Sequence, residues 1–158
     1  MRGIAFLAIF AIMPLAEAQS PVIPAACGAS DVRFDVKLDK SQHALAQPEP
    51  GKALVYFFQD AALTRIGIDG AWVGANTNQS YFSVAVDPGE HHLYAKLDAH
   101  DKPVELTHFT AESGGVYSFR RRVVFSEVGR YLSFGPVDGD EVQYLVHAYS
   151  LSLFKVRK

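Results

Sequence analysis

The chain cannot form an internal disulfide bond, because its 158 residues include a single cysteine, Cys27. If the protein is exported, its stability must therefore come from core packing. A strong charge of one sign is also missing, since 15 lysines and arginines stand against 17 aspartates and glutamates, for a net charge of −2. This balance gives no indication of nucleic acid or an anionic membrane surface as a partner.

Several sequence motifs of enzymes are absent as well. The chain has no Gly-x-Ser-x-Gly and no His-Glu-x-x-His, and it has neither a P-loop nor a Gly-x-Gly-x-x-Gly. Cys27 has no histidine close to it in the sequence, which makes it a poor candidate nucleophile. We therefore favour a non-enzymatic protein without a cofactor or a bound metal, although a triad assembled only in space would leave no such motif.

A long apolar run occurs only at the N-terminus. Arg2 precedes the apolar residues Ile4–Leu15, and Ala16–Ala18 then supply a small-x-small pattern. This arrangement is typical of a secretory signal peptide, and the apolar run is shorter than the roughly 20 residues of a membrane-spanning helix. We predict that residues 1–18 are a signal peptide, that the mature chain begins at Gln19 and that it contains no integral membrane span.

The residues after the predicted signal peptide are rich in proline and alanine. We predict a flexible segment over residues 19–31 and a folded domain over residues 32–158. Cys27 follows "PAA", as in a weak lipoprotein processing site, but Pro21 and Pro24 separate it from the apolar run. We therefore expect a protein of the periplasm or cell envelope that has no lipid anchor on Cys27.

From residue 32 onward, apolar and polar residues mostly alternate with the period of two that is typical of β-strands. Segment 53–59 is apolar on both faces and predicts a central strand covered on both sides. Asp69-Gly70 predicts a hairpin, and Pro88-Gly89 predicts a turn that joins its flanking strands as antiparallel partners. We expect strands over residues 32–38, 53–59, 64–69, 72–76, 80–86, 90–97, 104–111, 116–125 and 130–136.

The period of the apolar residues changes near the C-terminus. Val142, Leu145, Val146 and Tyr149 recur at i, i+3, i+4 and i+7, which predicts an amphipathic helix. Asp138 is a suitable N-cap, and we expect the helix to cover the outer face of the central strand. The sequence therefore predicts a mainly β fold, a single antiparallel β-sandwich of Ig-like or prealbumin-like type with one C-terminal α-helix.

Four separated stretches carry a resemblance to a known family. They are "GKALVYFF", "TRIGIDGAWVGANTNQSYFSVAVDPGEHHL", "FTAESGGVYSFR" and "DEVQYLVHAYSLS", and they lie between Gly51 and Ser152. In this order they resemble bacterial exported proteins of the domain-of-unknown-function 2846 family. The shorter pattern of Asp-Gly, Gly and Pro-Gly-x-His is also similar to surface-attached β-domains of the PEGA type. The resemblance implies a small β-sandwich of the cell envelope with no assigned activity and no catalytic residues.

Two adjacent histidines follow the Pro-Gly turn. His91 and His92 lie in one predicted strand, so their side chains point to opposite faces and cannot share a metal without distortion. We interpret His91 as a residue at the start of the strand that holds the turn through a ring nitrogen. Asp69 and Asp87 precede glycine or proline, and we interpret both as turn residues.

Other roles for these histidines remain open from the sequence. A metal-binding protein would use His92 with His100 and His108, which lie on neighbouring stretches. A hydrolase would instead use His91 or His92 with Asp87 or Glu90 as the carboxylate. The sequence by itself does not decide between these two alternatives and a binding module.

Aromatic residues flank the loop "GANTNQS". Trp72 and Tyr81 would suit contact with a glycan or peptide if they were exposed, although we favour a half-buried Trp72. Together with His91 and His92 they are the candidate binding residues, and the expected partner is an unknown envelope protein or glycan. The run Arg120–Arg122 predicts a solvated basic face, with its middle arginine paired to an acid near the sheet edge.

Overall fold

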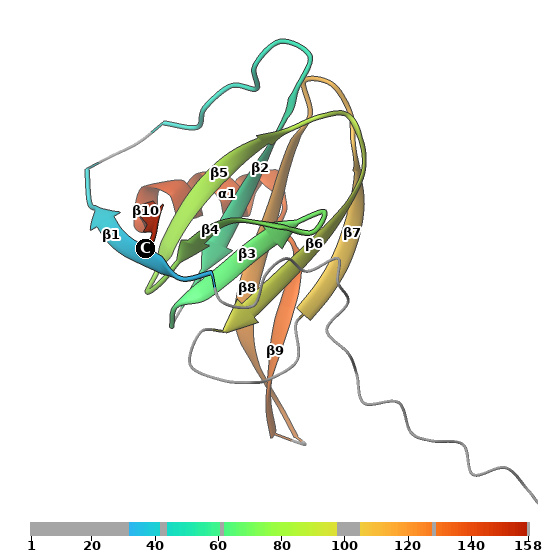
Figure 1. Cartoon of the computed structure of the whole chain (residues 1–158). Helices are drawn as coiled ribbons and strands as arrows, with labels where there is room; N and C mark the ends of the chain where they lie inside the picture. The colour runs from blue at the N-terminus through green and yellow to red at the C-terminus, as the bar shows by residue number, and fades with distance from the viewer. Residues whose placement is uncertain (1–31, 42–43, 61, 98–104, 128, 158) are drawn as a thin grey trace, which may run out of the picture.

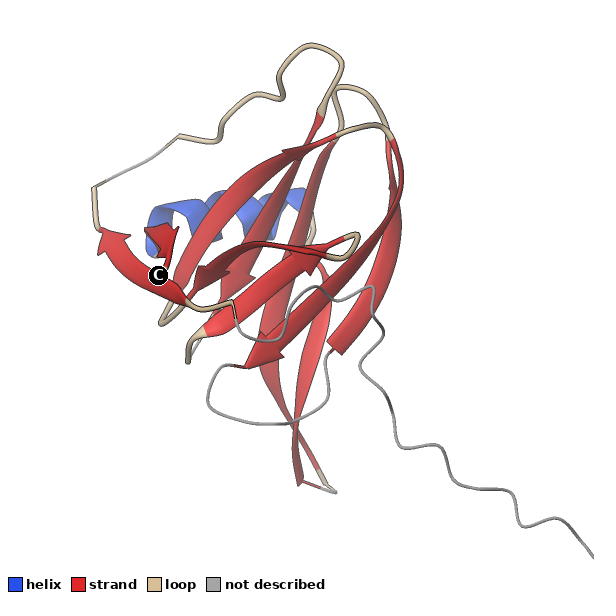
Figure 2. Cartoon of the chain, viewed as in Figure 1, coloured by secondary structure: helices blue, strands red, loops and turns tan. Residues whose placement is uncertain are grey.

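The computed structural model describes residues 32–41, 44–60, 62–97, 105–127 and 129–157. The predicted signal peptide and the segment 19–31, which includes Cys27, lie outside these residues. Within the described residues, ten strands form two sheets, and one helix lies behind the larger sheet (Figures 1 and 2). The elements are β1 (Phe34–Asp39), β2 (Ala53–Gln59), β3 (Thr64–Ile68), β4 (Ala71–Asn76), β5 (Ser80–Val86), β6 (Gly89–Leu97), β7 (Glu105–Ala111), β8 (Val116–Ser126), β9 (Gly129–Pro136), α1 (Gly139–Ala148) and β10 (Ser150–Val156).

The larger sheet is mixed, and this corrects the prediction of antiparallel strands alone. Its six strands have the order β1-β10-β5-β2-β8-β9, in which β2 pairs in parallel with β8 and β5 pairs in parallel with β10. The smaller sheet has the order β4-β3-β6-β7 and is antiparallel throughout. The chain enters β8 from β7 of the smaller sheet, and it enters β10 from α1. Neither β8 nor β10 is therefore joined by a hairpin to the strand with which it pairs in parallel.

The Pro88-Gly89 turn also has a different role from the predicted one. We predicted that it joins two antiparallel partners, but β5 belongs to the larger sheet and β6 to the smaller sheet. The turn therefore carries the chain from one sheet to the other. Gly89 has a φ of 140°, in the region that favours glycine, and this freedom lets the chain bend between the layers.

The Asp69-Gly70 hairpin is confirmed. It joins β3 to β4, which pair in antiparallel fashion, and both turn residues have positive φ, 48° for Asp69 and 86° for Gly70. Two successive positive φ values are typical of the tight turns that match the twist of hairpin strands.

The main core lies between the two sheets. Val55, Phe57 and Phe119 of the larger sheet pack against Ile66 and Leu93 of the smaller sheet, and all five are buried. Every residue of β2 is buried, which confirms the prediction of a central strand covered on both sides. The protein is thus a mainly β structure in which two sheets enclose an apolar interior.

Helix α1 covers the other face of β2, as predicted. The Asp138 side chain accepts a hydrogen bond of 2.9 Å from the Glu141 backbone N–H and caps the first turn. The apolar face of the helix then packs on alternate residues of β2, through Val142, Leu145 and Val146 against Leu54, Tyr56 and Phe58. Within the described residues, no helix is long and apolar enough to span a membrane.

The chain does not end with this helix, since β10 follows it and was not predicted. Serines and leucines alternate over Ser150–Leu153, but Ser152 is the residue that faces inward, at 3% exposed, whereas Leu153 is 51% exposed. The Ser152 hydroxyl donates a hydrogen bond of 2.8 Å to the Ala75 carbonyl, which satisfies the buried oxygen. Polar and apolar residues therefore alternate here in the register opposite to their burial, and the apolar Phe154 directly after Leu153 ends the alternation.

Candidate functional site

His91 connects two turns of the chain. Its Nδ1 atom lies 2.6 Å from Asp69 Oδ2, and its Nε2 atom lies 2.7 Å from the backbone carbonyl oxygen of Asp87. The other oxygen of Asp69 accepts a hydrogen bond of 2.8 Å from the His92 backbone N–H. The interpretation of His91 as a residue that holds the Pro-Gly turn is therefore confirmed, and Asp69 is a partner that the sequence did not predict.

Both ring nitrogens of His91 face acceptors, so the doubly protonated imidazole satisfies the site best. Burial lowers the pKa of His91, but the contacts with the Asp87 carbonyl and the Asp69 carboxylate outweigh it and raise that pKa. The pKa of Asp69 is lowered, because bonds from His92 N–H and His91 outweigh the effect of burial. Neither nitrogen of His91 is open to take a proton from a substrate, so its contacts are those of a structural link.

The carboxylates of the hydrolase alternative lie apart from His91. Asp87 Oδ1 is 2.7 Å from Lys52 Nζ in an exposed ion pair, and only its backbone reaches His91. Glu90 Oε1 lies 3.9 Å from His92 Nε2, and both of these side chains are well exposed. The predicted residues therefore do not assemble into an acid–base pair inside a closed pocket.

His92 and His108 lie on the outer face of the smaller sheet. They are directly opposite each other in the β6–β7 pairing, and their ring centroids are 6.3 Å apart. His91 is buried on the inner face, so the two adjacent histidines do point to opposite faces as predicted. His100 lies outside the described residues. Within the described ranges, no group of three or more histidine, cysteine, aspartate or glutamate side chains is placed to hold a metal ion.

Trp72 and Tyr81 do not lie together. Trp72 is partly buried on the smaller sheet, where the Arg65 guanidinium lies 4.8 Å from its ring centroid and the Tyr94 ring meets it edge-on at 4.9 Å. Tyr81 is 3% exposed beneath α1, and its ring centroid lies 5.5 Å from that of Phe58. The structure thus places one of these aromatic residues in an aromatic–cation cluster and the other in the core under the helix.

The three consecutive arginines are not a solvated face, contrary to prediction. Arg120 binds Asp60 through Nε at 2.9 Å and also contacts Glu141, whose second oxygen lies 2.6 Å from Arg122 Nη2. Arg121 lies on the inward face of β8 and is 5% exposed. These contacts fasten α1 to β8, so the run has a structural role that its sequence alone did not reveal.

Tyr149 completes this network. Its hydroxyl donates to Asp60 Oδ1 at 2.7 Å and accepts from Arg120 Nη2 at 2.9 Å. Burial and the neighbouring Asp60 carboxylate raise the pKa of Tyr149 to about 12. The phenol therefore stays protonated near neutral pH and acts as a hydrogen-bond donor.

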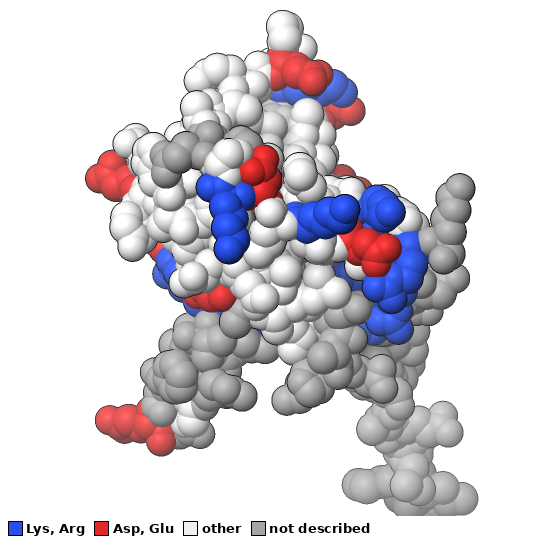
Figure 3. Space-filling view, turned by 90° about the vertical axis from the view of Figure 1, so that its left-hand side faces the viewer, with Lys and Arg blue, Asp and Glu red and all other residues white. Residues whose placement is uncertain are grey.

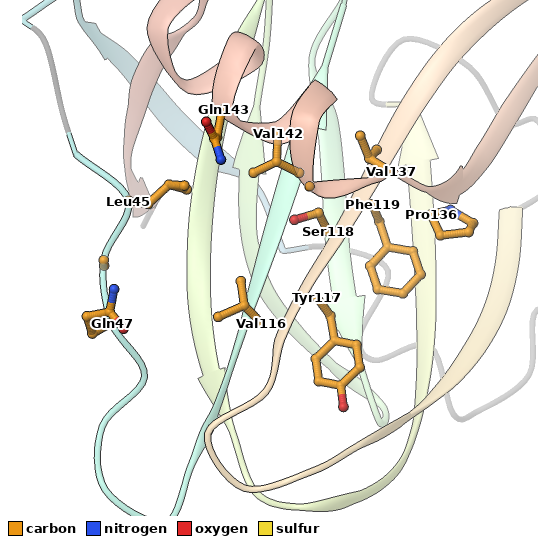
Figure 4. Close-up of a pocket in the computed structure, with 12 residues that line it drawn as sticks. Leu45, Gln47, Val116, Tyr117, Ser118, Phe119, Pro136, Val137, Val142 and Gln143 are labelled. Atoms are coloured by element: carbon orange, nitrogen blue, oxygen red, sulfur yellow. The ribbon is translucent and has the colours of Figure 1, made fainter.

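An open hollow of about 410 Å³ lies between residues 45–47, the start of β8 and the first turns of α1. Figure 4 shows Leu45, Val116 and Val142 on three sides of it. Its volume lies within the range of roughly 300–1,000 Å³ that is typical of ligand pockets. Its apolar lining residues include Leu45, Ala46, Val116, Val137 and Val142, and its polar ones include Gln47, Ser118 and Gln143.

A second hollow of about 260 Å³ continues along the helix. It is lined by Ala44, Leu45, Gln143, Val146 and His147, so it shares two residues with the first hollow. We call the two hollows together the helix groove. One signal for this groove is present in the sequence, because Leu45 is an isolated leucine within a connection that is otherwise typical of a polar loop.

Surface charge does not form an extended field on the face that Figure 3 presents. Lysines and arginines occur there singly or in small groups beside aspartates and glutamates, with uncharged side chains between them. This distribution agrees with the near balance of charges in the sequence. The face that Figure 3 presents thus offers no extended basic surface as a binding site.

Comparisons with known proteins identified no relative of this chain. No protein-family model, no curated protein and no solved structure matches this chain.

Proposed function

We propose that the protein is an exported β-sandwich module of the bacterial cell envelope that binds another envelope component without catalysing a reaction. Support for export comes from the pattern of Arg2, the apolar run and Ala16–Ala18. Two packed sheets with a covering helix support a sandwich of Ig-like or prealbumin-like type. The resemblance to the domain-of-unknown-function 2846 family supports the envelope as its location.

The helix groove is the observation that carries the binding proposal. Leu45, Val116, Val137 and Val142 contribute apolar side chains to its main hollow of about 410 Å³, and the volume of this hollow suits a ligand group. Val116 on its floor is 51% exposed, so apolar surface there would be removed from water by an occupant. The groove is therefore the best candidate for a contact surface.

The occupant that we propose is a protein segment that inserts large apolar side chains. A glycan presents many hydroxyl groups, and each of these needs a polar partner when it is buried. The main hollow offers Gln47, Ser118 and Gln143 for a few hydrogen bonds, whereas the side chains of Leu45, Val116, Val137 and Val142 offer none. Of the two expected partner classes, an envelope protein fits this lining better than a glycan.

Site-specific photocrosslinking in cells tests this function. A benzoylphenylalanine at Gln143, which lines both hollows, should form an adduct with a partner protein in the periplasmic fraction. The matched control is the same residue at Tyr144, which is 69% exposed on α1 and does not line either hollow. The full chain is expressed, so the fraction that holds the adduct also reports on export. Equal adducts from both positions, or none from Gln143, would contradict the proposal.

A further inference from the structure

The outer face of the smaller sheet carries a pair of facing imidazoles. His92 of β6 is directly opposite His108 of β7, with ring centroids 6.3 Å apart and ring planes 35° apart. Both side chains are exposed, that of His92 to 70%. This pair lies apart from the helix groove, which is on the other side of the larger sheet.

Hydrogen bonds show which kind of cross-strand pair this is. The His92 N–H donates to Asp69 Oδ1 at 2.8 Å, and the His92 carbonyl accepts from the Asp69 N–H at 3.0 Å. The backbone polar groups of His92 are therefore turned toward the β3–β4 hairpin and away from β7. His92 and His108 consequently form a non-hydrogen-bonded pair, whose Cα atoms are only about 4.5 Å apart and whose side chains approach most closely.

This geometry suits chelation by two side chains. Exposed imidazoles rotate at little cost, and such a rotation can bring one nitrogen of each ring to the roughly 2.0–2.1 Å ligand distance of a zinc ion. Neutral imidazole is a good ligand for zinc, copper and nickel. Glu90 lies on the same face, with Oε1 3.9 Å from His92 Nε2, and adds a negative charge beside the pair.

We propose that His92 and His108 together chelate a divalent transition-metal cation such as Zn²⁺, with solvent completing its coordination. The ion joins β6 to β7 through their side chains, at a position where the native pairing already holds the ligands together. Because the unfolded chain does not hold the two rings side by side, the bound ion stabilises the folded protein. This site does not depend on the groove or on its proposed partner.

Titration calorimetry with zinc chloride tests the proposal on protein purified without a polyhistidine tag. The wild type should bind zinc, and His92→Ala and His108→Ala should each weaken binding by about tenfold or more, since each removes half of the chelate. The control is His147→Ala, which removes an exposed histidine on α1 and should bind zinc as tightly as the wild type.

A second readout separates chelation from a folding defect. Zinc should raise the melting temperature of the wild type and of the His147→Ala variant, but it should no longer do so in either variant of the pair. All three variants should melt close to the wild type when a chelator is present, because the substituted side chains are exposed. The proposal is wrong if the wild type binds no zinc, or if either variant of the pair binds it as tightly as the wild type.

Discussion

The imidazole of His91 connects the β3–β4 hairpin to the turn between the two sheets, through Asp69 on one side and the Asp87 carbonyl on the other. The period of two in the sequence was sufficient to place His91 and His92 on opposite faces. Asp69 could not be predicted as a partner, because that contact depends on the register of β3 against β6, in which Ile68 is opposite Leu93. A local sequence pattern predicts the face of the sheet to which a side chain points. To predict which residue of the neighbouring strand it contacts, the register between the two strands must also be known.

The free energy of unfolding should depend on pH through this contact. The pKa of His91 is raised above its ordinary value of 6.5, so its contribution is fully present below that value and is lost as the pH rises through the folded-state pKa. The pKa of Asp69 is lowered below 3.8, so its contribution is present above that value and is lost as the pH falls through its folded-state pKa. The contact therefore stabilises the fold most in mildly acidic solution.

Urea unfolding of wild type and His91→Leu at two pH values measures this dependence. The substitution should cost more free energy of unfolding at about pH 5.5 than at about pH 8.5, since the charged contact that it removes is weaker at the higher pH. Thr110→Ala, which removes an exposed side chain of β7 that does not titrate, serves as the control and should show a much smaller difference between the two conditions. A cost for His91→Leu that is the same at both pH values would show that the contact does not titrate as described.

Helix α1 is the element that the sequence predicted best, because its apolar period, its N-cap and the strand that it covers were all identified correctly. Strand β10 was missed because its alternation of serine and leucine is short and ends at Phe154, and because Ser152 rather than Leu153 is the buried residue. The pairing of β5 with β6 was predicted wrongly, because a Pro-Gly turn looks the same in sequence whether it closes a hairpin or carries the chain between sheets. Turn chemistry thus identifies a bend but leaves the neighbours of the flanking strands undetermined.

The stability of the whole fold should depend on the packing of α1 against β2. Leu145 is 1% exposed within that contact, and Leu145→Ala should lower the free energy of unfolding by about 2–5 kcal/mol, since it leaves a cavity. Its neighbour Tyr144 is 69% exposed, and Tyr144→Ala should change the free energy of unfolding by about 0.5 kcal/mol or less. Chemical denaturation of both variants checks the difference, and similar costs would mean that the helix is not packed on the sheet as described.

At the level of the whole molecule, the sequence predicted the mainly β class and the helix but not the groove. Residues 45–47, Val116 and Val142 are far apart in the chain, and only the arrangement of the sheet and helix brings them together. Of the candidate residues chosen from the sequence, His91 holds a turn, Tyr81 packs in the core and Trp72 lies in the cluster with Arg65 and Tyr94, whereas His92 is exposed. Residue type alone favoured histidines and aromatic residues as binding residues, whereas aliphatic side chains such as those of Leu45, Val116 and Val142 help to line the hollow.

The central claim is that the helix groove binds apolar groups, and fluorescence titration with Nile red, a neutral apolar probe, tests it most directly. Val116→Arg and Leu153→Arg are a matched pair, since both residues lie in strands of the larger sheet and are 51% exposed, but only Val116 lines the groove. Loss of an apolar contact of about 1.5 kcal/mol corresponds to roughly a tenfold change in affinity. We predict that Val116→Arg weakens probe binding by about tenfold while Leu153→Arg binds like the wild type. Equal binding by all three proteins, or a loss in Leu153→Arg alone, would contradict the claim.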